Sequence, residues 1–187
     1  MGQPGLTTAG KVDATDRWSQ RLDAAAVVVL VVVALVTWQH DSATAGLTPA
    51  AGAPAWSTTR DALLDGPDAG RWLWQAKALV AGDSDRLDPH RMPAWTLLTV
   101  LAAAVTRYPL VVAGHLVNHL LGVVIGPVVY GLGRVYSLGR APALAAGALV
   151  VLSPTWMESC RAFGVDPTVT FLWPAGLLLA GLAGRRT

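Results

Sequence analysis

Five long stretches without any charged residue are the feature that most constrains how this chain can fold. They are Ala24–His40, Met92–Thr106, Tyr108–Gly133, Ala141–Met157 and Pro167–Gly184. A helix needs about 20 apolar residues, and at least about 17, to cross a hydrocarbon layer about 30 Å thick. Four stretches reach that length, and Met92–Thr106 is marginal. The sequence therefore predicts an all-α integral membrane protein with about four transmembrane helices.

The composition supports this class. Hydrophobic residues make up 53% of the 187 residues and charged residues only 14%, whereas about a quarter of an ordinary soluble domain is charged. The net charge of +2 does not indicate nucleic-acid binding, because the basic residues lie at the ends of apolar segments, where they act as topology signals. A single cysteine excludes an intramolecular disulfide.

The first apolar stretch is predicted to be a retained signal-anchor helix. It begins only at Ala24 and is longer than the usual core of a signal peptide, which has about 7–15 residues. It ends in the bulky residues Trp38-Gln-His40, which do not fit the small-x-small pattern of a cleavage site.

Three groups of basic residues indicate the topology, since Lys and Arg are enriched on cytoplasmic loops. If all three groups are cytoplasmic, the chain crosses the membrane an even number of times between each pair. We therefore expect spans at about 23–39, 110–133, 141–157 and 168–184 within a membrane region 22–184. The tail 1–21 and the end 185–187 are then cytoplasmic, in a protein of the plasma (cytoplasmic) membrane. The groups are Lys11, Arg17 and Arg21; Arg134 and Arg140; and Arg185 and Arg186.

The outer side then carries a long loop, about 40–108. Within it Met92–Thr106 is predicted to lie in the membrane interface or to dip part-way. Asp68–Gly82 is predicted to be an amphipathic interfacial helix that stops at Gly82. Its apolar face is expected to hold Trp72, Ala76, Leu79 and Val80, with Arg71, Gln75 and Lys77 away from it.

Two acids on this outer side are candidate catalytic residues. Asp68 precedes the interfacial helix, so it is either an N-cap or a partly desolvated carboxylate that accepts a proton from a hydroxyl. Asp166 lies in Gly164-Val-Asp-Pro167, and capping of the next helix is the favoured reading from spacing alone. Two acids from two loops would nevertheless suit general-base or metal-assisted transfer.

Other polar residues carry weaker signals. Arg91, beside His90, would grip a phosphate through its planar fork or simply pair with lipid phosphate or Asp88. His115, Asn118 and His119 share a helix face, where interhelical hydrogen bonding is favoured over a metal pair. Gly122-x-x-x-Gly126 permits close helix approach.

The order of these features resembles the N-terminal part of the GT-C superfamily of polytopic glycosyltransferases, the dolichyl- or polyprenyl-phosphate-sugar users related to protein mannosyltransferases and the aminoarabinose transferase. The resemblance covers roughly residues 22–184. It departs from the family at Ala69, where Glu is frequent, and at Trp72, where Tyr is common. The family also has more spans, so we expect a truncated product, a fragment, one half of a split enzyme or a relic that binds without catalysis. The resemblance rests on Asp68-x-x-x-Trp72-x-x-x-Ala76, Arg91-Met-Pro93-Ala-Trp95, Leu152-Ser-Pro154 and Asp166-Pro167.

The resemblance implies transfer of a sugar from a polyprenyl-phosphate carrier to an acceptor hydroxyl at the outer face. Asp68 and Asp166 would be the catalytic acids, with Arg91, His90 and Trp72 binding substrate. No metal ligands are assigned, and a divalent cation is neither required nor excluded. The expected partners are the bilayer, the lipid-linked sugar and separately encoded C-terminal spans. The alternative is a non-catalytic membrane subunit or scaffold whose acids are helix caps.

The topology makes a direct prediction about thiol accessibility. In a Cys160-free background, cysteine at position 46 or 84 should react with an impermeant thiol reagent added to intact cells, and cysteine at 137 should not. Positions 88 and 107, on either side of Met92–Thr106, should both be reachable from outside. Labelling at 137, or opposite-side accessibility of 88 and 107, would contradict the four-span topology.

Overall fold

A computed structural model describes residues 9–44, 69–88, 93–161 and 166–185, and within these ranges all regular secondary structure is helical. The all-α prediction is therefore confirmed for the described part of the chain. The elements are α1 (Ala9–Thr44), α2 (Ala69–Ala81), the 3-10 helix η2 (Ser84–Arg86), α3 (Pro93–Thr106), α4 (Leu110–Val135), α5 (Arg140–Val151), α6 (Pro154–Arg161) and α7 (Asp166–Gly184).

Three of these helices are long and apolar enough to cross a membrane. They are α1 over Arg17–Thr37, α4 and α7. The stretch predicted as one continuous span at 141–157 is instead a pair, α5 and α6, bent by 49°. The break has a local cause, because Pro154 lacks an N–H and its ring would clash with the carbonyl group four residues earlier. The N–H groups of Leu152 and Ser153 bond back to Ala148 and Val150 and close α5.

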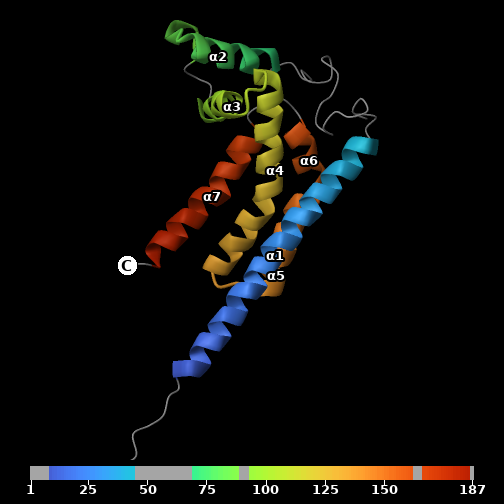
Figure 1. Ribbon diagram of the computed structural model, residues 1–187, viewed down its shortest axis with the longest axis vertical. Coiled ribbons are helices and arrows are strands. Elements are labelled where there is room, and N and C mark those ends of the chain that lie inside the picture. The colour runs from blue at the N-terminus through green and yellow to red at the C-terminus, as the bar shows by residue number, and fades with distance from the viewer. Residues whose placement is uncertain (1–8, 45–68, 89–92, 162–165, 186–187) are drawn as a thin grey trace, which may run out of the picture.

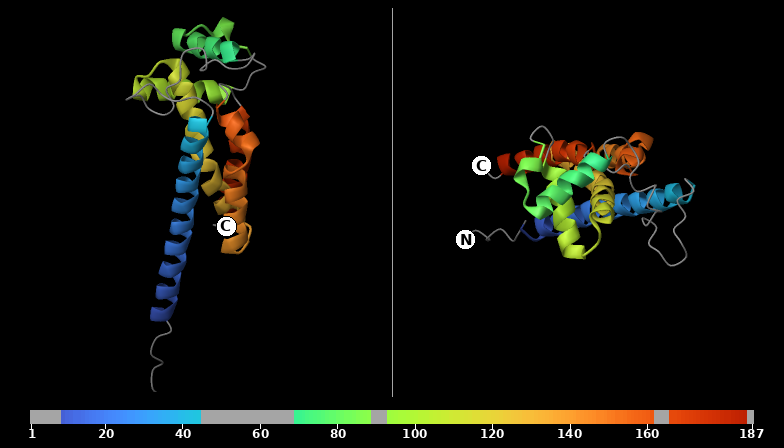
Figure 2. Two further views of the ribbon diagram at one scale, coloured as in Figure 1. Left: turned by 90° about the vertical axis from the view of Figure 1, so that its right-hand side faces the viewer. Right: turned by 90° about the horizontal axis from the view of Figure 1, so that it is seen from above.

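The apolar helices lie along the long axis of the molecule, and α2 and α3 lie across one end of it (Figures 1 and 2). The chain ascends through α1, descends through α4, ascends through α5 and α6 and descends through α7 (Figure 1). The start of α1, the α4–α5 link and the end of α7 therefore lie away from α2 and α3. The marginal stretch Met92–Thr106 contains α3, which lies crosswise to the bundle instead of running beside it.

The central helix is α4, which contacts every other α-helix of the described part. It approaches α5 where two glycines face each other, Gly126 and Gly147. A Cβ added at Gly147 would lie 2.8 Å from the carbonyl oxygen of Gly126 and 2.9 Å from Leu30 Cδ1 of α1. One added at Gly126 would lie 2.6 Å from Val151 Cγ2. The predicted close approach at Gly122-x-x-x-Gly126 is thus confirmed, because Gly122 packs in the same way against Cys160.

This packing predicts that a single methyl group at Gly147 destabilises the fold. Gly147→Ala should lower the melting temperature in detergent, because the new Cβ meets a backbone oxygen that cannot swing away. Gly176→Ala in α7 is the matched control, since nothing lies within 4 Å of the added atom. It should keep or raise the melting temperature, as alanine is about 1 kcal/mol more favourable than glycine inside a helix. Equal melting temperatures for the two variants would contradict the packing.

Candidate functional site

A buried aromatic contact joins α2 to α3 at the end where they cross the bundle. The rings of Trp72 and Trp95 meet edge to face, with centroids 5.9 Å apart and planes at 64°. Ala69 and Val117 complete the apolar cluster around them. The indole N–H of Trp95 donates a hydrogen bond to Asn118 Oδ1 of α4, with a donor–acceptor distance of 2.8 Å. The Trp95–Asn118 hydrogen bond thus connects α3 to α4, and the contact between the Trp72 and Trp95 rings connects α2 to α3.

The polar face of α4 is used for packing at this point. Asn118 makes the interhelical hydrogen bond that its position predicts, with Trp95 as the partner that the sequence alone did not identify. A buried indole N–H needs a hydrogen-bond acceptor, and this requirement is the sequence signal that could have identified Trp95 as the partner. His119 Nδ1 lies 2.6 Å from the carbonyl oxygen of His115 on its own helix. Among the described residues, His, Cys, Asp and Glu form no group of three that could hold a metal ion.

The predicted buried face of α2 is wrong in two positions. Val80 is 62% exposed, and Gln75 is buried together with Trp72 and Ala76. Apolar residues occupy more than one side of this helix, so periodicity does not select the face that is buried. The contact with Trp95 selects it. The predicted stop is confirmed, because Gly82 adopts φ +69° and its N–H bonds to the carbonyl oxygen of Leu79.

The structure describes two of the five predicted site residues. Trp72 is 7% exposed and lies in the α2–α3 contact. Asp166 is exposed in the first turn of α7, where the positive end of the helix dipole favours a carboxylate. Asp68, His90 and Arg91 lie outside the described residues.

Three threonines with buried hydroxyl groups lie at the end of the bundle where α2 and α3 cross it. Thr96 and Thr99 belong to the first two turns of α3, and Thr168 belongs to the first turn of α7. In the part of the chain that the structure describes, their Oγ1 atoms have no hydrogen-bond partner. Buried polar groups are nearly always satisfied in folded proteins, so these three hydroxyls are exceptions among the described residues. The sequence analysis did not single them out, because threonine is common in apolar helices.

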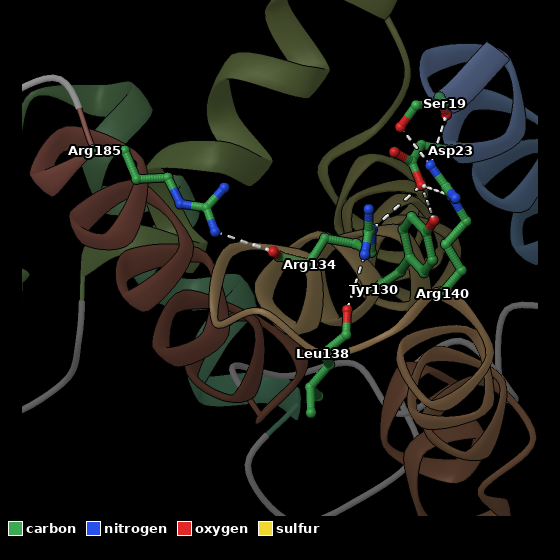
Figure 3. A network of polar contacts seen from close by, with 7 residues as sticks. All are labelled: Ser19, Asp23, Tyr130, Arg134, Leu138, Arg140 and Arg185. Atoms are coloured by element: carbon green, nitrogen blue, oxygen red, sulfur yellow. Dashed lines mark hydrogen bonds and ion pairs between the residues drawn. The ribbon is translucent and has the colours of Figure 1, made fainter. Parts of the chain in front are cut away.

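A second polar cluster lies at the opposite end of the bundle, with Asp23 of α1 at its centre (Figure 3). Asp23 Oδ1 accepts a hydrogen bond from the hydroxyl of Tyr130, at 2.5 Å. The same oxygen lies 3.0 Å from Arg140 Nε and 3.3 Å from Arg134 Nε. Arg140 also donates to the hydroxyl of Ser19. One carboxylate thus joins α1, α4 and the start of α5.

Arg185 extends this cluster to the end of α7. Its guanidinium donates to the backbone oxygen of Arg134 (Figure 3). It also donates to the backbone oxygen of Val135, the last residue of α4. Members of two of the three basic groups, Arg134 and Arg140 in the α4–α5 region and Arg185 after α7, therefore lie at the end where α1 starts. The sequence analysis identified these arginines as topology signals but missed Asp23, whose signal was its place between Arg21 and the first uncharged stretch.

Comparison with protein-family models, with curated proteins and with solved structures finds no match.

The Trp95–Asn118 hydrogen bond predicts a coupled pair of substitutions. Trp95→Phe and Asn118→Leu should each lower the free energy of unfolding by about 1–3 kcal/mol, because each removes the hydrogen bond. Trp95→Phe also leaves the buried Asn118 Oδ1 atom without this donor. The double variant should lose less than the sum of the two, because the bond can be lost only once. As a control, Asn118→Leu combined with Trp74→Phe, on the exposed side of α2, should show no coupling. Additive losses for the first pair would contradict this arrangement.

Proposed function

We propose that this chain is embedded in a membrane through α1, α4, the α5–α6 pair and α7, with α2 and α3 at the outer surface. Large apolar side chains support this, since they stand exposed along α1 and α7 and include Val36, Trp173 and Leu179. Apolar surface of that extent is typical of contact with lipid or another protein. Leu97, Leu101 and Val105 form an exposed apolar face on α3, which suits a helix lying in the interface.

We further propose that the protein is, or is part of, a GT-C-like glycosyltransferase that uses a polyprenyl-phosphate sugar. The observation that best supports this proposal is the position at which α2 and α7 begin. The first residue of α2 directly follows Asp68, and α7 begins at Asp166. Both helices begin at the end of the bundle where α2 and α3 lie (Figure 1). The two acids that the family resemblance selects are therefore attached to elements at one end of the molecule.

In the proposed reaction, Asp68 takes the proton of the acceptor hydroxyl. The hydroxyl oxygen then forms a bond to the anomeric carbon of the sugar. The bond between that carbon and the phosphate oxygen breaks, and the lipid phosphate leaves with the electron pair. Arg91 and His90 hold the phosphate, and Asp166 holds the acceptor. Because phosphate is a good leaving group, positioning and deprotonation supply most of the catalysis.

In this proposal Trp72 acts through the fold. Its ring is buried against Trp95, and Trp72 follows Asp68 by four residues in the sequence. It would fix the start of α2 relative to α3 and α4. Trp72 is therefore a positioning residue, and contact with the sugar or the phosphate is assigned to the other candidates.

A non-catalytic scaffold is the competing function. The place of Asp166 in the first turn of α7 favours it, because helix stabilisation alone would explain a carboxylate there. The use of Asn118 and of the α4 glycines in packing also suits a subunit whose role is to bind other helices.

Substitution of Asp68 separates the two functions. In membranes containing the complete assembly, Asp68→Asn should lower sugar transfer from a panel of polyprenyl-phosphate sugars by about 10²-fold or more, the usual scale for a general base. Asp166→Asn should raise KM more than it lowers kcat. Asp85→Asn, an exposed acid in η2 on the same side, is the matched control and should leave transfer unchanged.

The contrary result is equally specific. If Asp68→Asn costs about 1 kcal/mol of stability while transfer is unchanged, the carboxylate acts only as a helix cap. If Asp85→Asn reduced transfer as much as Asp68→Asn does, the loss would not be specific to Asp68. Either result would contradict the role of Asp68 as the general base, and the first would favour the scaffold.

A further inference from the structure

The cluster around Asp23 carries more positive than negative charge. One carboxylate, Asp23, faces the guanidinium groups of Arg134 and Arg140. Arg185 adds a third guanidinium through its bonds to the last carbonyl groups of α4. Among these four side chains the formal charge is +2. The carboxylate therefore orients two of the guanidinium groups without neutralising the cluster.

The cluster is also accessible. The side chains of Arg134 and Arg140 keep 31% and 39% of their surface exposed, and Arg185 is exposed as well. Guanidinium groups bind phosphate oxygens well because their N–H groups form a planar fork. Asp23 binds the guanidinium groups of both Arg134 and Arg140. The N–H groups of these two arginines that do not bond to Asp23, Ser19 or Leu138 are therefore within reach of one anion.

The surroundings of the cluster favour a lipid as the source of that anion. Trp18 is 65% exposed and Tyr136 is 60% exposed, and both belong to segments that supply the cluster. Tryptophan and tyrosine rings are enriched at the level of lipid headgroups. Leu22 and Leu138 are exposed in the same segments and offer apolar surface to acyl chains. A soluble phosphate ion would not need these aromatic and apolar neighbours.

We propose that Arg134, Arg140 and Arg185 form a binding site for the phosphate of an anionic phospholipid, on the opposite side of the membrane from the candidate catalytic acids. The proposal rests on the membrane embedding proposed above, but not on glycosyl transfer. Asp23 keeps two of the arginines in place through α1, so the bound headgroup links the ends of α4, α5 and α7. A loss of sugar transfer on substitution of Asp68 would be independent of this site.

The test uses the whole chain, purified in a neutral detergent and exposed to equal amounts of phosphatidylglycerol and phosphatidylcholine. Native mass spectrometry should show that the bound lipid is enriched in phosphatidylglycerol. Arg185→Gln should reduce that enrichment about fivefold, equivalent to the approximately 1 kcal/mol expected for one basic side chain near an anionic surface. Because Arg185 is exposed and contacts only backbone oxygens in the described contacts, this variant is expected to fold.

Asp23→Asn removes the carboxylate that keeps Arg134 and Arg140 in place. Enrichment of phosphatidylglycerol should therefore fall, although the net charge of the protein becomes more positive. Arg107→Gln makes the same charge change as Arg185→Gln but lies after α3, at the other end of the bundle. This control should leave the enrichment unchanged.

Three results would overturn the proposal. The first is an equal binding of the two lipids to the unsubstituted protein. The second is an effect of Arg107→Gln as large as that of Arg185→Gln, which would indicate a general response to charge. The third is complete displacement of phosphatidylglycerol by millimolar inorganic phosphate, which would identify a site for a soluble anion.

Discussion

The close approach of α4 and α5 at Gly126 and Gly147 is the contact on which the arrangement of the other helices depends. Leu30 of α1 fills the space beside these glycines, so three helices meet at one level. In lipid there is little hydrophobic gain from pairing apolar helices, because lipid tails are as apolar as the side chains. Association then relies on van der Waals contact between closely packed backbones. For a chain in the proposed membrane setting, these small residues are what bring the apolar helices together.

Polar contacts at the two ends of the bundle fix how far the helices are shifted along one another, which the glycine contacts alone do not fix. At one end the Trp95–Asn118 hydrogen bond holds α3 on α4, and the Trp72 ring holds α2 on α3. At the other end Asp23 joins α1 to the α4–α5 region. Without such contacts, helices packed through small residues could slide along one another. The proposed transfer reaction depends on this, because α2 and α7 must begin in fixed positions for the acids beside them to act on one substrate.

Local features of the chain could be predicted from its sequence, and long-range pairings could not. Uncharged stretches marked the apolar helices, Gly82 marked the end of α2, and the glycine spacing marked the α4 packing face. The bend at Pro154 was missed because the uncharged stretch continues through it. Asp23 was missed because its partners are more than 100 residues away. The roles of Asp68, His90 and Arg91 stay predictions.

In the proposed membrane setting, the apolar helices cross the bilayer while α3 lies along its surface. Spin labels at 97, 101 and 105 on α3, and at 172 and 179 on α7, test this arrangement in bilayers through their relative accessibility to oxygen and to a water-soluble nickel complex. At 1.5 Å per residue, each set extends about 10–12 Å along its helix. We expect nearly constant depth along α3 and a depth change of about 10 Å along α7. A depth change along α3 as large as that along α7 would contradict this membrane arrangement.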